Sequence, residues 1–240
     1  MHLSEHQLTY GYWPSRELLG QNPDPIRHPD EYDGSETINL ACTQTGLSAR
    51  EQRNLVATWC DLLPELPVKT ALFSTKATQG LFDAVIANPR LEALFVKWSS
   101  VKSITVLSEH PKLTALHLGD SPSLSGLAYL RSLPMLRHLF VQGIRESVHL
   151  EFARELVGLV EFGLSAGGKP IAVESFEPLS AMQNLAILWL VRVRPRNGGL
   201  RPLDGLTQLK SFRTSLNLQS QDVQELRSEL PGLQYLQPVW

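Results

Sequence analysis

The sequence predicts an α/β solenoid, in which one short unit repeats along the chain and its strands form a single parallel sheet. Three observations predict this fold. Apolar blocks recur between Leu91 and Leu233 at intervals of 22, 23, 23, 26, 24 and 24 residues. Apolar positions alternate with others inside each block, as in a strand that buries one face. The segments between blocks are long enough to return the chain to the next strand through a helix or a 3₁₀ turn.

The blocks share the pattern L-x-x-L-x-L or a close apolar variant of it. They begin at Leu91, Leu113, Leu136, Leu159, Leu185, Leu209 and Leu233. This recurrence resembles the leucine-rich-repeat (LRR) superfamily, whose units run about 20–29 residues with one strand each. The resemblance implies a right-handed, horseshoe-shaped solenoid of about 8 repeats. Its parallel sheet would line the concave side, with helices or 3₁₀ turns on the convex side.

The same frame extends towards the N-terminus. The run from Leu72 to Ser74 begins 22 residues before Leu94, and Ile38 begins a further alternating block 34 residues earlier. We therefore expect the solenoid to span residues 36–240. Residues 1–35 contain four prolines and no clear period, which predicts an irregular N-terminal arm.

The turns after the strands depart from the family pattern, which often places an asparagine there. The corresponding positions are Ser99, Ser121, Ile144, Gly167, Val193 and Asn217. Since only Asn217 matches, the chain is identified as an irregular, bacterial-type member whose turns are stabilised in another way.

The first return segment is the most clearly helical. Ser48 and Glu51 form a capping box at the start of residues 47–63, which we expect to be an N-terminal cap helix. Leu55, Trp59, Leu62 and Leu63 share one face of it. Further helices are expected over residues 78–87, 147–157 and 219–230, a helix or 3₁₀ turn over 122–133, and a loop over 193–199. The tail 237–240 is expected to fold over the last strand.

The residues between the leucines are expected to line the concave sheet, because alternate side chains of a strand face opposite sides. The predicted central column includes Phe73, Phe95, His117, Phe140, Trp189 and Arg213, flanked by Lys97, Gln142 and His138. Exposed apolar patches usually mark contact surfaces, and aromatic and arginine side chains dominate binding hot spots. These nine residues are our candidate binding site for a protein partner.

Two alternatives for this aromatic column stay open. In one, the N-terminal arm covers the column and is pinned there by Tyr10, Tyr12 and Trp13. In the other, a second copy of the chain pairs with the column in a homodimer. Complete burial of both Phe95 and Trp189 by their own chain would exclude an open binding strip.

Composition argues against several classes of function. The formal charge is −2 with scattered basic residues, so neither nucleic acid nor a membrane is an expected partner. No apolar run is long enough for a membrane helix, and the first residues lack a signal peptide. The two cysteines, Cys42 and Cys60, do not make a disulfide framework, so we expect a cytoplasmic protein with small buried thiols.

No motif predicts catalysis, a cofactor or a resident metal. The stretch from Gly163 to Pro170 nearly matches a phosphate-binding loop, but a proline replaces the hydroxyl residue that holds magnesium. His117 and His138 lie in adjacent repeats, and Glu161 is a conceivable third metal ligand. An enzyme with its site at the arm is the alternative of a different class, and it would use His28, Asp30 and Asp33. The expected function is therefore a non-enzymatic interaction module, either an adaptor or a neutralising, immunity-type partner.

Overall fold

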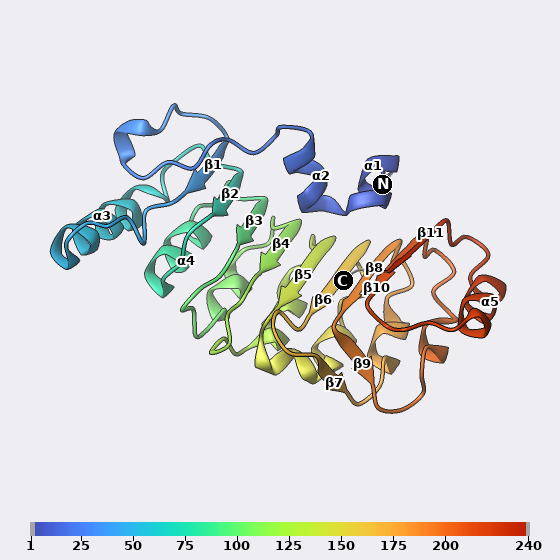
Figure 1. Ribbon diagram of the computed structural model, residues 1–240. Helices are drawn as coiled ribbons and strands as arrows, with labels where there is room; N and C mark the ends of the chain where they lie inside the picture. The colour runs from blue at the N-terminus through green and yellow to red at the C-terminus, as the bar shows by residue number, and fades with distance from the viewer. Residues whose placement is uncertain (1–2, 239–240) are drawn as a thin grey trace.

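The computed structural model describes residues 3–238, and within them the predicted α/β solenoid is confirmed (Figure 1). Nine strands of these residues form one sheet in which neighbouring strands are parallel and follow chain order. They are β1 (Thr37–Leu40), β2 (Thr70–Phe73), β3 (Ala93–Val96), β4 (Ala115–Leu118), β5 (His138–Gln142), β6 (Glu161–Ser165), β8 (Ile187–Val191), β10 (Ser211–Thr214) and β11 (Tyr235–Pro238). The resulting sheet is curved, and the return segments lie on its convex side.

The repeated leucines form one continuous core between the sheet and the return segments. In β3, Leu94 and Val96 are buried on this side, and Leu116 and Leu118 take the same places in β4. A single strand cannot remove these side chains from water, so the core exists only because successive repeats stack. The largest side chains in it are Trp59, Phe73, Phe82, Phe162, Phe176 and Phe212.

Three α-helices occupy return segments among the described residues: α3 (Ala49–Leu62), α4 (Gln79–Ile86) and α5 (Ser220–Glu229). The predicted capping box is present in α3, where Ser48 Oγ accepts the Glu51 backbone N–H at 3.4 Å and the Glu51 carboxylate accepts that of Ser48 at 3.0 Å. The inward face differs in one residue. Leu55, Trp59 and Leu63, spaced four residues apart, form the buried face, whereas Leu62 lies beside it and is exposed.

The other return segments are 3₁₀ helices, which corrects the prediction of a helix over residues 147–157. That region forms two 3₁₀ helices, Arg145–Val148 and Leu150–Ala153. The others in the return segments lie at Thr105–Glu109, Leu127–Ser132, Glu177–Ala181 and Arg201–Leu203. A 3₁₀ helix rises about 2.0 Å per residue, against about 1.5 Å in an α-helix, so it covers the return with fewer residues.

The predicted loop over residues 193–199 is partly a strand. β9 (Val193–Pro195) pairs in parallel with β7 (Ile171–Val173) in a separate two-stranded sheet. The longest repeat, the one of 26 residues between Leu159 and Leu185, supplies β7. Val193 is buried, so this strand closes the core where the family pattern has an asparagine.

Serine side chains stabilise two of the turns that lack the family's asparagine. Ser99 Oγ and Ser121 Oγ lie 2.5 Å apart, and Ser121 Oγ donates to the carbonyl of Gly119 at 2.7 Å. The backbone N–H of Val101 donates to Ser99 Oγ at 3.1 Å. The two buried hydroxyls thus link adjacent turns, and both of them are hydrogen-bonded.

The N-terminal arm is more regular than the prolines predict. Two short helices, α1 (Glu5–Tyr10) and α2 (Tyr12–Leu18), lie over the concave side of the sheet (Figure 1). Gly11 joins them with a φ of +77°, a conformation that other residues rarely adopt. The chain then reaches the outer edge of β1, where Ile26 forms a parallel bridge with Leu40. A 3₁₀ turn (Pro29–Glu31) leads into β1.

Two further expectations concern the ends of the chain and its helices. The predicted tail over residues 237–240 lies partly outside the described residues, and its described part belongs to β11. None of the helices in residues 3–238 has the length and apolarity that a membrane span requires.

Candidate functional site: a cavity between the arm and the concave sheet

The sheet register defines one central column of side chains on the concave face. It runs through Asn39, Leu72, Phe95, His117, Phe140, Gly163, Trp189, Arg213 and Gln237. Of the six residues predicted for this column, five are in it. The sixth, Phe73, is wrong: Leu72 lies opposite Phe95, whereas Phe73 lies opposite Val96 and is buried in the core. A shift of one residue moves a side chain to the other face of a strand.

The rings of this column follow one another across the strands. The ring centroids of Phe95 and His117 are 4.3 Å apart, and those of His117 and Phe140 are 5.0 Å apart with nearly parallel planes. Phe140 and Trp189 follow at 6.1 Å, although β6 lies between their strands. The Arg213 guanidinium ends the row, 4.4 Å from the Trp189 ring centre.

Gly163 explains how the row crosses β6. A Cβ atom at this position would lie 2.1 Å from Cδ2 of Phe140, which is far inside van der Waals contact. The absence of a side chain therefore lets the Phe140 ring lie over β6 and approach Trp189 on β8. Gly163, the first residue of the near match to a phosphate-binding loop, thus has a packing role in the structure.

The aromatic row is Phe95, His117, Phe140 and Trp189. The arm packs beside it, on the neighbouring column of side chains that lies two residues earlier on each strand. Trp13 contacts Ala93 and Ala115, whose small side chains leave room for it, and its ring centroid lies 5.3 Å from that of Phe95. Tyr12 stacks on His138 at 4.4 Å. Tyr12 and Trp13 thus hold the arm on the sheet, whereas Tyr10 is 40% exposed.

A buried carboxylate fastens the middle of the arm. Glu161 Oε2 accepts the backbone N–H of Tyr12 at 2.9 Å and lies 3.0 Å from Nδ1 of His138. Both side chains are buried, so these contacts satisfy groups that water does not reach. His138 and Glu161 therefore serve the arm contact. His117, considered from the sequence as a metal ligand together with His138 and Glu161, lies in a different column. It packs between two phenylalanine rings.

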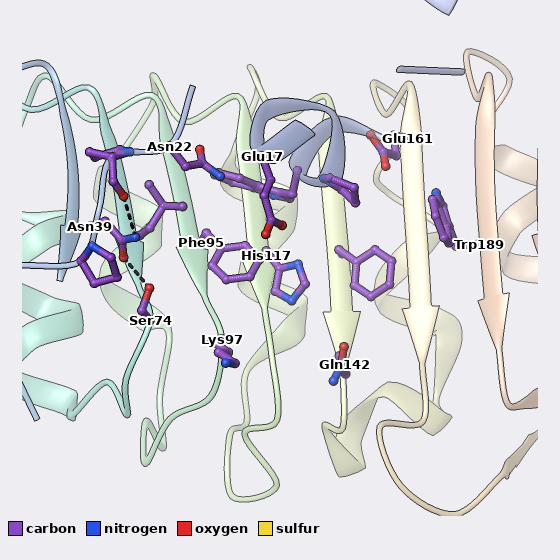
Figure 2. A pocket seen from close by; sticks show the side chains of 16 residues that line it. Glu17, Asn22, Asn39, Ser74, Phe95, Lys97, His117, Gln142, Glu161 and Trp189 are labelled. Carbon is purple, nitrogen blue, oxygen red and sulfur yellow. Dashed lines mark hydrogen bonds between the residues drawn. The ribbon is translucent and has the colours of Figure 1, made fainter. Parts of the chain in front are cut away.

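A cavity of about 600 Å³ lies between the arm and the aromatic row (Figure 2). Phe95, His117, Phe140 and Trp189 line it from the sheet, and each stays partly exposed. The arm contributes Trp13, Pro14, Glu17, Asn22, Pro23 and Pro25. Figure 2 shows Lys97 and Gln142 towards the carboxyl ends of their strands, at one side of the aromatic row. The arm thus covers part of the concave face and leaves the aromatic row within a cavity.

Three charged side chains line this cavity: Glu17 of the arm, Glu161 of β6 and Lys97 just after β3. Burial lowers the pKa of His117 to about 3, so its ring is neutral near pH 7. Burial also lowers the pKa of Arg213, a group that stays protonated because its ordinary value is so high. Lys97 is exposed at the rim. The lining therefore combines ring faces with a few polar and charged groups, a composition that suits binding.

The residues of the enzyme alternative do not form a closed site. His28, Asp30 and Asp33 are all exposed. The Ser35 backbone N–H lowers the pKa of Asp33, and those of Arg27 and His28 lower the pKa of Glu31. Hydrogen bonds to backbone thus favour the ionised forms of these two carboxylates, as in a solvated turn.

Sequence reasoning missed the arm's own share of the site. The sequence predicts only that Trp13 pins the arm, yet Trp13 lines the cavity together with Glu17 and Asn22. The adjacent aromatics Tyr12 and Trp13 were the signal that could have indicated this. Leu72 and Asn39 also line the cavity, at the end nearest β1.

Comparisons with known proteins identify the fold. The sequence matches no protein-family model and no curated protein. An internalin (inlF) of Listeria monocytogenes superposes with a TM-score of 0.52 at 16% identity, over 75% of this chain and 56% of that one. Internalin C2 of the same species gives 0.47 at 17% identity, over 71% and 81% of the two chains. A Leptospira interrogans LRR protein gives 0.48 at 15%, over 84% and 59%.

These likenesses concern the fold alone, and the chain spans only about half of the inlF structure that it matches. The likeness to inlF, together with the parallel sheet and its repeats, shows that this is a protein of the leucine-rich-repeat fold. Repeat solenoids of this kind present extended concave surfaces that commonly mediate protein binding.

Proposed function

We propose that this protein is a non-enzymatic interaction module that binds a protein partner on its concave face, as an adaptor or as a neutralising partner. The observation that carries the proposal is the aromatic row of Phe95, His117, Phe140 and Trp189, which remains partly exposed in a cavity although the arm lies beside it. Large rings on a soluble protein are seldom left accessible without a contact to make.

The shape of the site favours a segment of a protein as the ligand. The row crosses five neighbouring strands, from β3 to β8, so its contacts are spread along a line. Such a line suits an extended or helical segment that presents successive side chains. Lys97 and Gln142 flank it, and polar groups at a rim supply specificity around an apolar centre.

Identification of the partner and a measured affinity test the proposal together. Proteins retained from a lysate of the native cell by the immobilised chain would be identified, and the candidate would be purified and titrated calorimetrically. Phe140→Ala removes a ring of the row, and none of the aromatic contacts of Phe140 is to the arm. We expect it to weaken binding at least tenfold, about 1.4 kcal/mol, as truncation of a hot-spot ring does.

Tyr129→Ala is the matched control, because Tyr129 is an exposed ring in a 3₁₀ return segment and lies outside the concave face. It is expected to leave the affinity unchanged. Equal affinities for Phe140→Ala and the wild type would contradict a concave binding site. A doubled mass in light scattering that Phe140→Ala returns to that of one chain would instead support the homodimer.

A further inference from the structure

Unpaired polar groups are concentrated where the arm meets the sheet. Among the described residues, eight buried side-chain nitrogen or oxygen atoms have no hydrogen-bond partner in the protein. Four belong to the arm: His6 Nδ1, Trp13 Nε1, Arg16 Nε and Asn22 Oδ1. Three belong to the sheet on its concave side: Trp189 Nε1, Ser211 Oγ and Arg213 Nε. The eighth, His110 Nδ1, lies on the convex side. The arm therefore covers polar groups of the sheet without pairing them.

The three atoms of the sheet lie close together. Arg213 is the register neighbour of Trp189, and its guanidinium packs over the indole ring at 4.4 Å. Ser211 precedes Arg213 by two residues on β10, so its side chain is on the same face. The cluster thus combines a guanidinium, an indole N–H and a hydroxyl, all of which can donate hydrogen bonds.

The charge of Arg213 has no partner of opposite sign beside it. Only 9% of the residue is exposed, and within residues 3–238 no carboxylate lies at ion-pair distance from it. Glu161, which acts on it electrostatically, is held by His138 and by the Tyr12 backbone N–H. A buried cation without an adjacent anion is unfavourable, and a bound carboxylate would correct this.

Helix α1 covers this cluster without supplying such a group. Leu3 and Leu8 pack on Ala186 and Ile187, and the Tyr10 ring lies 6.0 Å from the Arg213 guanidinium. The only acidic side chain of α1, Glu5, is directed to the Tyr235 hydroxyl, at the long distance of 3.5 Å. A helix of six residues has little stability of its own, so apolar contacts are what keep α1 in place.

We propose that Trp189, Ser211 and Arg213 form the binding site for an acidic segment of the protein partner, and that α1 covers this site until the partner binds. The inference rests on the proposed function and adds to it the chemistry of the partner. The guanidinium and the indole N–H would donate to the carboxylate of an Asp or Glu side chain, with the indole ring beneath the guanidinium. One cation matches one carboxylate, whereas a phosphate dianion would need more positive charge.

A random library of peptides about 12 residues long provides a defined probe for the full-length chain, since a segment of that length can span the row of strands. Enriched peptides would be synthesised, labelled, and titrated by fluorescence anisotropy. We expect an Asp or Glu at one fixed position of the enriched peptides. Arg213→Gln should weaken them at least tenfold, whereas Arg194→Gln, which removes an exposed arginine on β9, should leave them unchanged. Peptides without an acidic residue, equal binding to Arg213→Gln, or no enrichment would each overturn the site.

A double-mutant cycle separates a direct contact from a folding defect. Replacing the peptide's acid by its amide should weaken binding to the wild type but cause no further loss with Arg213→Gln. Arg213→Lys keeps the charge but not the planar fork, and intermediate affinity is expected. Additive losses in the cycle would overturn the contact. Thermal unfolding shows whether each variant is folded. If Arg213→Gln is not folded, Arg213→Lys takes its place in the same cycle.

Two readouts keep this inference distinct from the proposed function. Peptides that depend on Phe140 but not on Arg213 would support a concave binding site and overturn the acidic one. Hydrogen exchange of the amides of residues 5–10 should speed up when a peptide binds, because α1 leaves the sheet. Unchanged protection of α1 in the complex would overturn the covering role.

Discussion

Two different parts of the chain pack on the two sides of the sheet. The return segments of the repeats cover its convex side and the N-terminal arm covers part of its concave side, and the two contacts differ in how well they bury apolar groups and pair polar ones. On the convex side, the leucine core is continuous, and His110 Nδ1 is the one buried side-chain polar atom of the described residues there without a partner. The bonds of Asn88 to the carbonyls of Leu63 and Leu66 illustrate the paired groups. On the concave side, the arm joins small apolar clusters and leaves seven of the described buried polar atoms unpaired.

This difference between the two sides shows that a segment covalently attached to the sheet can cover it without close packing. A return segment must pack closely against the leucines of the sheet, because the core is buried only where the return segments cover it. The arm is covalently joined to β1, so its local concentration at the sheet is high, and it can occupy the concave face with imperfect contacts. We expect the repeats, over residues 36–240, to determine the stability of the protein, and the arm to determine access to the aromatic row.

The largest expected effect compares Phe212→Ala with Trp13→Ala. Phe212 is completely buried in the core, and removing such a ring costs about 3–5 kcal/mol. Trp13 is nearly as buried but belongs to the arm, so its loss releases the arm and can cost no more than the arm contributes. Urea unfolding followed by circular dichroism should show a large shift for Phe212→Ala and one below about 1 kcal/mol for Trp13→Ala.

Hydrogen exchange provides the control for this pair. Trp13→Ala should remove the protection of residues 5–18 while β4 and β5 remain as protected as in the wild type. Equal losses of unfolding free energy in the two variants would mean that the arm is part of the cooperative core, and the comparison would then be wrong.

A smaller effect concerns pH, because His117 packs between the Phe95 and Phe140 rings and its burial lowers its pKa. Its pKa is about 3 in the folded protein and about 6.5 in an unfolded chain, so the unfolded state binds the proton more readily. Its contribution to stability is complete above about pH 6.5 and is lost as the pH falls towards about 3. Between about pH 7 and pH 5 the loss should reach up to about 2 kcal/mol.

His117→Phe keeps an aromatic ring between Phe95 and Phe140 but cannot take up a proton. Urea unfolding at both pH values should therefore show a smaller acid-induced loss for this variant than for the wild type. The same dependence in both proteins would mean that burial between the two phenylalanine rings does not lower the pKa of His117 in solution.

The smallest effect is local and concerns the anchor of the arm. Glu161→Gln keeps an oxygen that can accept the Tyr12 N–H but removes the charge beside His138. A charge-assisted hydrogen bond is worth about 1.5–3 kcal/mol and a neutral one about 1 kcal/mol. Amide exchange in α2 should therefore quicken about tenfold at pH 7, with no change in β10. Exchange at the wild-type rate would show that the stacked rings alone hold the arm.

The repeat frame was predictable because every repeat must bury its leucines, so their spacing is constrained along the chain. The frame failed at β2, where Ala71, Leu72 and Phe73 are all apolar and alternation gives no sign of which faces the core. Five residues of the central column followed correctly, since Phe95, His117 and their neighbours lie between clear leucines.

The covered state of the site was only one of the alternatives that the sequence left open. Helices α1 and α2 have six and seven residues, too few for a clear period, and they are held by contacts with Glu161 and Ile187, far along the chain. Local sequence carries little information about such contacts. The unpaired groups around Arg213 follow from the same long-range packing.

The path of the chain along β1 has a consequence for association between molecules. A parallel sheet with two free edges invites copies to add end to end, and such head-to-tail contacts continue into filaments when they do not close into a ring. Here the Ile26 backbone pairs with the Asn39 carbonyl and the Ala41 N–H, and the Ser35 hydroxyl donates to the Thr37 carbonyl. In the nine-stranded sheet, no described strand lies on the outer side of β11, while Ile26 covers part of the outer edge of β1. The cover on β1 therefore opposes the head-to-tail pairing of β1 with β11 of another copy, which is the contact from which a filament would grow.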